Sequence, residues 1–274
     1  MSIQLGRYGI WKRAAETNTD LAREVESLGY GSLWVGGSPS GDLQIVEDVI
    51  AATKSIGVAT GIVNMWREDA DAVAGSYHRI QERHPDRFLL GVGIGHPEAT
   101  AEYRSPFETM VSYLAELAAA GVPRQRIIVA ALGPRSLRLA GQRTVGSHPY
   151  FTTPRHTRLA REIVGEGVVV APEQTVVVDD DRDRAREVAR PFAARYLGLV
   201  NYRNSLLREG WAQEDLENGG SEQLLDQVVL IGAASQVADG IRAHVEAGAD
   251  HVSIQVLGDD PMVGYRALAR ELLE

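Results

Sequence analysis

The sequence predicts an α/β protein with one domain over residues 1–274, folded as a (β/α)8 barrel of the TIM-barrel class. Short apolar runs typical of strands alternate with longer runs of helical period. Parallel strands need crossover helices, so repeated β–α units favour a parallel sheet, and eight units favour closure into a barrel. A length of 274 residues suits one such barrel, and no linker divides it. An open, doubly wound sheet is the alternative.

Eight segments are expected to form strands, because each contains a short apolar run of β type. They are residues 3–10, 32–35, 56–63, 88–94, 126–132, 145–151, part of 168–178, and 251–257. If the barrel forms, these strands are its wall, and their carboxyl ends carry the functional residues.

Helices are expected between the strands. The first, at residues 18–28, places Leu21, Val25 and Leu28 at spacings of four and three and ends at Gly29, a suitable C-terminal cap. The pattern repeats at residues 42–54, 69–83, 107–120, 134–141, 154–164, 182–199, 235–247 and 261–273.

One stretch departs from the alternation, because no strand is expected between Val178 and His251. Residues 201–211 and 214–231 are expected to be further helices, joined by a polar turn at 217–221. We therefore expect a helical excursion between the seventh and eighth strands that packs on the barrel.

Composition excludes several classes of function. The 28 basic and 37 acidic residues give a net charge of −9, which argues against a nucleic-acid partner or an anionic membrane surface. No apolar stretch approaches the roughly 18 residues of a membrane span, and the N-terminus lacks the pattern of a signal sequence. The absence of cysteine excludes disulfides, thiolate metal sites and a cysteine nucleophile. A cytoplasmic enzyme acting on a small molecule is expected.

Lysine occurs only at positions 12 and 54. Neither Lys12 nor Lys54 stands beside the glycines of a P-loop. A Schiff-base aldolase needs a lysine on a barrel strand, and only Lys12, just after the first predicted strand, could serve.

The predicted strand ends are rich in glycine. Such ends occur at residues 9–11, 36–39, 61–64, 91–96, 131–135, 147–150 and 256–260. Glycine lets the backbone approach a flat ligand closely and frees N–H groups for anions, so several such ends together favour a bound cofactor. The run from Gly91 to Gly95 has the spacing G-x-G-x-G, which departs from the dinucleotide fingerprint.

Two predicted helix starts are suited to a phosphate. Gly133 precedes Pro134, which fits the first helical position, and the N–H groups of the residues that follow would then be free to bind an anion. Thr153 and Pro154 repeat this arrangement just after His148. Ordinary well-capped helices are the alternative interpretation of each start.

The seven histidines form no pattern typical of a metal site, and no metal is expected. His96 and His148 fall at predicted strand ends, where histidine can exchange protons near neutral pH. His96 is the candidate catalytic residue. The run Asp179–Asp181 is expected to cap the next helix rather than bind a metal.

Six segments together carry a resemblance that covers nearly the whole chain. They are residues 28–36, 59–64, 86–96, 130–135, 147–154 and 247–252. In order and spacing they resemble the luciferase-like monooxygenase superfamily, and within it the oxidoreductases that use the deazaflavin coenzyme F420. This resemblance implies an eight-stranded barrel, often a homodimer, with the cofactor ring lying across the strand ends.

The resemblance also implies which residues contact the cofactor. A bulge on the third strand, often with a non-proline cis peptide, supports the ring in the family and maps to Gly61–Ile62. The phosphate is expected near Gly133, Arg135 and Ser136, and near His148. The full set of residues expected to bind coenzyme F420, or FMN in its place, is Gly61, Ile62, Asn64, Gly93, Gly95, Gly133, Arg135, Ser136 and His148.

Two positions depart from the family pattern. Many deazaflavin members carry a histidine at the end of the second strand, where this chain has Ser38 or a neighbouring glycine. Members that protonate the substrate with a glutamate after the fourth-strand glycines have it where this chain has His96. His96 is therefore expected to exchange the proton that accompanies hydride transfer, while Trp11 and Trp66 are candidates for the pocket wall or the core.

Three other functions remain open. The first is an FMN-dependent monooxygenase on the same fold, and the second is a catalytically silent flavin-binding barrel, which fits the missing second-strand histidine. The third is a cofactor-free lyase or isomerase acting on a sugar phosphate, against which the shortage of lysine and of clustered carboxylates argues.

Overall fold

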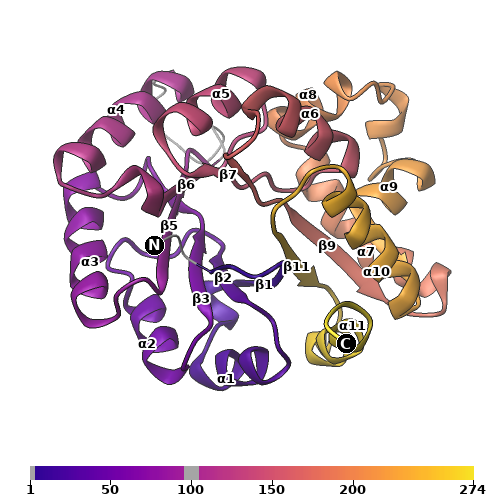
Figure 1. Cartoon of the computed structure of the whole chain (residues 1–274). Coiled ribbons are helices and arrows are strands. Elements are labelled where there is room, and N and C mark those ends of the chain that lie inside the picture. Colours follow the sequence, from indigo (N-terminus) through magenta and orange to yellow (C-terminus); the bar gives the residue numbers. More distant parts are fainter. Residues whose placement is uncertain (1–3, 96–104) are drawn as a thin grey trace.

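The computed structural model describes residues 4–95 and 105–274, so His96 lies outside the described residues. Strands lie at the centre and helices surround them (Figure 1). The strands are β1 (Tyr8–Arg13), β2 (Ser32–Gly36), β3 (Gly57–Gly61), β4 (Val63–Asn64), β5 (Phe88–Gly93), β6 (Ile127–Val129), β7 (Gly146–Ser147), β8 (Val169–Val170), β9 (Glu173–Val178), β10 (Val229–Gly232) and β11 (Val252–Val256).

Each predicted helical segment outside the excursion contains a helix. The helices are α1 (Thr19–Ser27), α2 (Gln44–Ala52), α3 (Ala70–Arg83), α4 (Pro106–Ala119), α5 (Pro134–Arg143), α6 (Pro154–Val164), α7 (Arg182–Leu197), α8 (Val200–Arg208), α9 (Glu222–Val228), α10 (Ala234–Glu246) and α11 (Pro261–Leu272). Among the described residues, none of the helices is both long and apolar enough to cross a membrane.

The strands form one parallel, curled sheet in the order β10-β9-β11-β1-β2-β3-β5-β6-β7-β8, and β4 also pairs with β5. One extended segment holds both β8 and β9: β8 pairs with β7, and β9 pairs with β11. Between β8 and β9, Ala171 N donates to Ser147 O of β7. On the other side of the segment, Ser253 N of β11 donates to Pro172 O. This segment closes the ring, so the barrel is confirmed and the open sheet is wrong.

Side chains from four neighbouring strands meet at one level of the barrel interior. Trp11 of β1 lies beside Trp34 of β2, Trp34 beside Ala59 of β3, and Ala59 beside Leu89 of β5. These four side chains belong to one buried cluster. Two adjacent indoles followed by the smaller Ala59 and Leu89 therefore fill this level of the interior.

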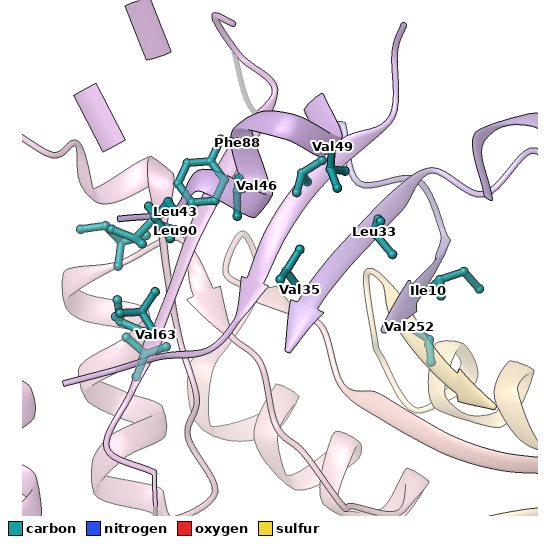
Figure 2. Packing of buried hydrophobic residues seen from close by; sticks show 14 of the residues in the cluster. Ile10, Leu33, Val35, Leu43, Val46, Val49, Val63, Phe88, Leu90 and Val252 are labelled. Atoms are coloured by element: carbon teal, nitrogen blue, oxygen red, sulfur yellow. The ribbon is translucent and has the colours of Figure 1, made fainter. Parts of the chain in front are cut away.

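Residues that alternate with the interior set point outward and form the core beneath the helices. Figure 2 shows Leu33 and Val35 of β2 near Val46 and Val49 of α2, all buried. Alternation along a strand places successive side chains on opposite faces, so Trp34 points inward between these two outward residues. Burial of each such aliphatic side chain contributes about 1.5–3 kcal/mol to folding.

The helical excursion is confirmed, but it contains a strand that was not predicted. Helices α7, α8 and α9 follow β9 and pack with Phe151 in a second apolar cluster. The predicted helix at 214–231 is wrong at its end, where β10 pairs with β9 from Val229 opposite Thr175 to Gly232 opposite Val178. The carboxyl-terminal half of β9 has an edge that no strand of the ring occupies, and β10 pairs with this edge as an additional strand.

Candidate active site

Two adjoining cavities lie at the carboxyl ends of the strands. The first has a volume of about 440 Å³ and is lined by Ile94, Gly95, Pro106, Phe107, Met110, Ala130, Ala131, Leu132, Gly133, Pro134, Arg135, Ser136, His148, Tyr150, Asn201, Tyr202, Asn204 and Arg208. The second has a volume of about 320 Å³ and is lined by Trp11, Arg13, Gly37, Ser38, Gly61, Ile62, Asn64, Arg67, Ala130, His148, Tyr150, Arg195, Tyr196 and Tyr202. Ala130, His148, Tyr150 and Tyr202 line both, so the cavities form one elongated site.

Eight of the nine residues expected to bind the cofactor line this site. Gly61, Ile62 and Asn64 line the second cavity, while Gly95, Gly133, Arg135 and Ser136 line the first, and His148 lines both. Gly93 lines neither cavity. A Cβ placed on it would lie 2.9 Å from Ala130 Cβ and 3.0 Å from Ile62 Cγ1, so the absence of a side chain at Gly93 leaves room for Ile62. The catalytic role of His96 remains a prediction, because that residue lies outside the described part of the chain.

The backbone at the end of β3 has the predicted special conformation. The peptide bond between Gly61 and Ile62 is cis. A Cβ on Gly61 would lie 2.6 Å from Trp11 Nε1 and 3.1 Å from His148 Nε2, so these two ring nitrogens face the backbone here and only glycine fits. Trp11 thus lines the second cavity, whereas Trp66 lines neither cavity.

His148 presents an unprotonated nitrogen to this point. Its Nδ1 donates to Ala171 O at 2.7 Å, which assigns the proton to Nδ1 and leaves a lone pair on Nε2. Burial lowers the pKa of His148 to about 4, with a smaller effect of His251, so the ring is neutral at pH 7. Among the described residues, His148 Nε2 and Trp11 Nε1 are both buried without a hydrogen-bond partner.

Tyr150 joins the barrel to the helical excursion at the boundary of the two cavities. Its hydroxyl donates to Gln255 Oε1 at 2.8 Å and lies 3.1 Å from the hydroxyl of Tyr196 on α7. Burial raises the pKa of Tyr150 well above its usual value, so the phenol stays protonated. Tyr150 stands in a strand end that the sequence singled out, but nothing in its spacing marked the side chain as functional.

The amino end of α5 has the features of an anion site. Gly133 is the N-cap, no side chain caps the helix, and Pro134 occupies its first position. Arg208 of α8 approaches this end, since a Cβ on Gly133 would lie 3.9 Å from Arg208 Nη2. The guanidinium of Arg135 lies 4.2 Å above the ring of Phe107. Arg208 was not predicted, because no spacing in the sequence relates a residue of the excursion to Gly133.

The amino end of α6, the second predicted phosphate position, has a partner within the chain. Thr153 caps this helix and its Oγ1 also donates to Glu209 Oε2 at 2.5 Å. Glu209 is 1% exposed, and burial raises its pKa to about 7. Because the carboxyl group of Glu209 already lies at the start of α6, the start of α5 is the better position for a phosphate.

Comparison with known proteins identifies the family. The profile of the luciferase-like monooxygenases matches residues 4–120 and 114–251. The chain belongs to the luciferase-like monooxygenase family. A comparison with curated protein sequences gives no match.

Several solved structures share this luciferase-like fold. An F420-dependent secondary alcohol dehydrogenase in complex with an F420-acetone adduct superposes with a TM-score of 0.75 at 16% identity, covering 96% of this chain and 97% of the other. A coenzyme F420-dependent tetrahydromethanopterin reductase from Methanopyrus kandleri gives 0.74 at 14% identity, covering 100% and 99%. The oxygenating constituent of 3,6-diketocamphane monooxygenase from Pseudomonas putida, in complex with FMN, gives 0.67 at 16% identity, covering 96% of both chains. Luciferase-like proteins of this fold thus include enzymes of both cofactors.

Proposed function

We propose that this luciferase-like protein is a coenzyme F420-dependent oxidoreductase that transfers a hydride between the deazaflavin and a small organic substrate. The observation that carries the proposal is the elongated site, with the Gly61–Ile62 backbone in one cavity and the uncapped start of α5 in the other. A flat ring with a phosphate-bearing tail has the shape and the charge for such a site.

The residues around Gly61 fit a flavin-type ring. Trp11 Nε1 offers a hydrogen-bond donor, and His148 Nε2 offers an acceptor. Buried polar atoms are rarely left without partners, so this pair favours a ligand edge that carries both a carbonyl and an N–H group. The pyrimidine edge of a deazaflavin or flavin has both.

The tail of the cofactor would be held at the other end of the site. Gly133 and Ser136 belong to the start of α5, whose free N–H groups and dipole favour an anion. Arg135 and Arg208 add two guanidinium groups to the same cavity. Guanidinium groups form strong, charge-assisted hydrogen bonds with phosphate oxygens.

The bound deazaflavin would supply the two-electron hydride chemistry, and the chain would supply binding, orientation and proton exchange. Neutral His148 would accept a hydrogen bond at Nε2 without adding a positive charge to the cavity. Asn64 and Ile62 line the same cavity as Gly61 and would position the ring from the side of β3. His96, which directly follows Gly95 of the first cavity, is proposed to exchange the accompanying proton.

The choice of coenzyme F420 over FMN follows from the sequence segments that resemble the deazaflavin branch. Fluorescence titration of the purified protein with oxidised coenzyme F420 and with FMN tests it. Micromolar or tighter binding of coenzyme F420 alone supports the proposal. Preference for FMN, with oxygen consumption by the reduced complex in an oxygen electrode, would assign a monooxygenase instead, and binding of neither would remove the redox function.

The resemblance also leads us to propose a homodimer. Light scattering of the purified protein tests this assembly, and a mass of one chain would contradict it.

A further inference from the structure

We propose that the substrate carries an anionic group, a carboxylate, sulfonate or phosphate, which Arg13, Arg67 and Arg195 bind at the second cavity. This inference rests on the proposed function, since it places the anionic group of the redox substrate beside the cofactor ring in the second cavity and the cofactor tail in the first cavity.

Three arginines from separate elements meet at the second cavity. Arg13 ends β1, Arg67 follows β4 in a turn closed by its N–H to Asn64 O at 3.0 Å, and Arg195 lies on α7. All three line the cavity of about 320 Å³. The described residues that line this cavity include no aspartate or glutamate, so its charged groups are all positive.

These arginines also differ from many others in the chain. Arg79 pairs with Glu47 at 3.0 Å, and Arg186 pairs with Asp226 at 3.0 Å. Within the described ranges 4–95 and 105–274, none of Arg13, Arg67 and Arg195 takes part in an ion pair. In a protein of net charge −9, unpaired guanidinium groups around one cavity create a local positive potential that favours an anion.

Two of the guanidinium groups act on the same side chain of the cavity wall. Burial raises the pKa of the Tyr196 phenol, and the positive charges of Arg195 and Arg13 oppose this rise. Arg195 lies 6.0 Å from the centre of the Tyr196 ring. Arg13 of β1 and Arg195 of α7 therefore both lie near the Tyr196 side chain in the wall of the second cavity.

The cationic residues of the site form two separate groups. Arg135 and Arg208 line the first cavity together with the start of α5, and they suffice for a phosphate tail. Arg13, Arg67 and Arg195 line only the second cavity of the two, beyond the shared residues His148 and Tyr150. A cofactor whose phosphate tail binds Arg135 and Arg208 leaves Arg13, Arg67 and Arg195 for the other reactant, next to the ring in the second cavity.

A third cavity, of about 400 Å³, adjoins the second and shares Trp11, Arg13, Arg195 and Tyr196 with it. Glu16 and Asp259 line this third cavity, and Glu16 Oε2 already pairs with Lys12 Nζ at 2.6 Å. Lys12, Arg13 and Arg195 line it as well, so the third cavity carries charges of both signs, whereas the described residues that line the second cavity carry only positive charges. The anionic group therefore binds in the second cavity, and a neutral part of the substrate can extend into the third.

The test compares charged and neutral ligands of the same shape. The holoprotein, loaded with whichever cofactor it binds, is titrated by calorimetry with short carboxylates from acetate to octanoate and with the matching primary amides. We expect at least one carboxylate to bind about tenfold or more tightly than its amide, because each guanidinium–carboxylate contact is charge-assisted. The preference should weaken at high salt, since the three arginines are exposed.

Variants assign the preference to these residues. The triple variant Arg13→Gln/Arg67→Gln/Arg195→Gln should lose the preference, and Arg195→Lys should keep part of it. Arg270→Gln, an exposed arginine of α11 outside all three cavities, is the matched control and should bind as the wild type does. All three substituted side chains are exposed, so circular dichroism should show a folded protein in each case.

Cofactor titrations of the same variants separate the two sources of anionic charge. If the triple variant weakens coenzyme F420 or FMN as much as it weakens the carboxylate, the arginines bind the acidic tail of the cofactor and the inference is wrong. If the wild type binds neither cofactor, the proposed function fails, while the carboxylate titration of the chain itself still decides the inference. Equal affinity for acids and amides would overturn it.

Discussion

The imidazole of His148 stacks on the indole of Trp34, with ring centroids 4.1 Å apart and planes 18° apart. Trp34 Nε1 in turn donates to His251 Nε2 at 2.9 Å, and His251 Nδ1 donates to Gly6 O at 2.8 Å. A buried aromatic stack inside the barrel therefore fixes the position of His148 in the wall of the site. Both histidines in this stack must remain neutral, because charging either would place an uncompensated cation in the barrel interior.

This arrangement predicts that acid destabilises the protein. Burial lowers the pKa of His148 and His251 to about 4 and that of His244 to about 3, below the usual histidine value of 6.5. Below pH 6.5 the unfolded chain therefore binds more protons at these sites than the folded chain does. Each histidine then lowers the free energy of unfolding by about 1.4 kcal/mol for every pH unit of acidification, until its folded pKa is reached.

Two buried carboxyl groups have the opposite effect. Burial raises the pKa of Glu173 to about 8 and that of Glu209 to about 7, above the usual glutamate value of 4.5. Their contribution is complete below pH 4.5 and is lost as pH rises through 7 and 8. With the three histidines, these groups place the maximum of stability at about pH 6–6.5.

Thermal unfolding followed by circular dichroism across pH 4–9 checks this maximum. The variant Glu209→Gln keeps an oxygen that can accept from Thr153 and cannot ionise, so its stability relative to the wild type should rise between pH 4.5 and 7 and stay level above pH 7. Glu166→Gln, at an exposed carboxyl group, is the control and should follow the wild type at every pH. A constant difference between Glu209→Gln and the wild type from pH 5 to 9 would contradict the raised pKa.

Substitution of Gly61 should impair cofactor binding. In Gly61→Ala the new Cβ would stand 2.6 Å from Trp11 Nε1, a buried ring atom with little freedom to move. We expect destabilisation of about 1–3 kcal/mol from overpacking, and cofactor affinity reduced about tenfold or more because the backbone and both ring nitrogens shift. Chemical denaturation and fluorescence titration measure the two effects.

Gly75→Ala provides the comparison for Gly61→Ala. Gly75 lies inside α3, and a Cβ there would meet nothing within 4 Å. Alanine should raise the stability of this helix by roughly 0.5–1 kcal/mol and leave cofactor binding unchanged. Equal behaviour of the two variants would show that the space around Gly61 is not needed.

Removal of the His96 side chain should affect proton exchange more than cofactor binding. In His96→Ala we expect the same cofactor affinity, a lower kcat, and loss of the limb of the pH–rate profile that reflects the imidazole. His84→Ala serves as the control, since His84 ends α3 and lines none of the three cavities. An unchanged pH profile with a true substrate would exclude His96 as the proton donor.

Most of the fold could be predicted because strand and helix periods alternate clearly. Strand β10 could not, because Leu224, Leu225 and Val228 run directly into Val229 and continue an apolar stretch of helical spacing. The change from helix to strand at this point is decided by pairing with Thr175–Val178 of β9, a contact distant in sequence. The length of the predicted strand at 145–151 was likewise excessive, since only Gly146–Ser147 form ladder pairs.

The candidate site was predictable where its signals are local. Gly133, Pro134 and Ser136 were found because a proline at the first helical position marks a helix start whatever surrounds it. Arg195 and Arg208 were not found, because α7 and α8 bring them over the strand ends only after the excursion has folded. Local backbone chemistry is visible in one sequence, whereas convergence of side chains from distant helices is not.

Arg208 should contribute to the binding of the cofactor phosphate and not to the binding of its ring. It lines the first cavity beside the start of α5, and burial lowers its pKa without removing its charge at pH 7. In Arg208→Gln, we expect about tenfold weaker binding of FMN or coenzyme F420, because a charge-assisted contact is lost. Riboflavin, or the phosphate-free deazaflavin, should bind the variant and the wild type equally. Arg138→Gln, at an exposed position on α5 outside the cavity, should change neither affinity. Equal weakening of the phosphorylated and phosphate-free ligands by Arg208→Gln would instead assign Arg208 to the shape of the cavity and remove it from the phosphate site.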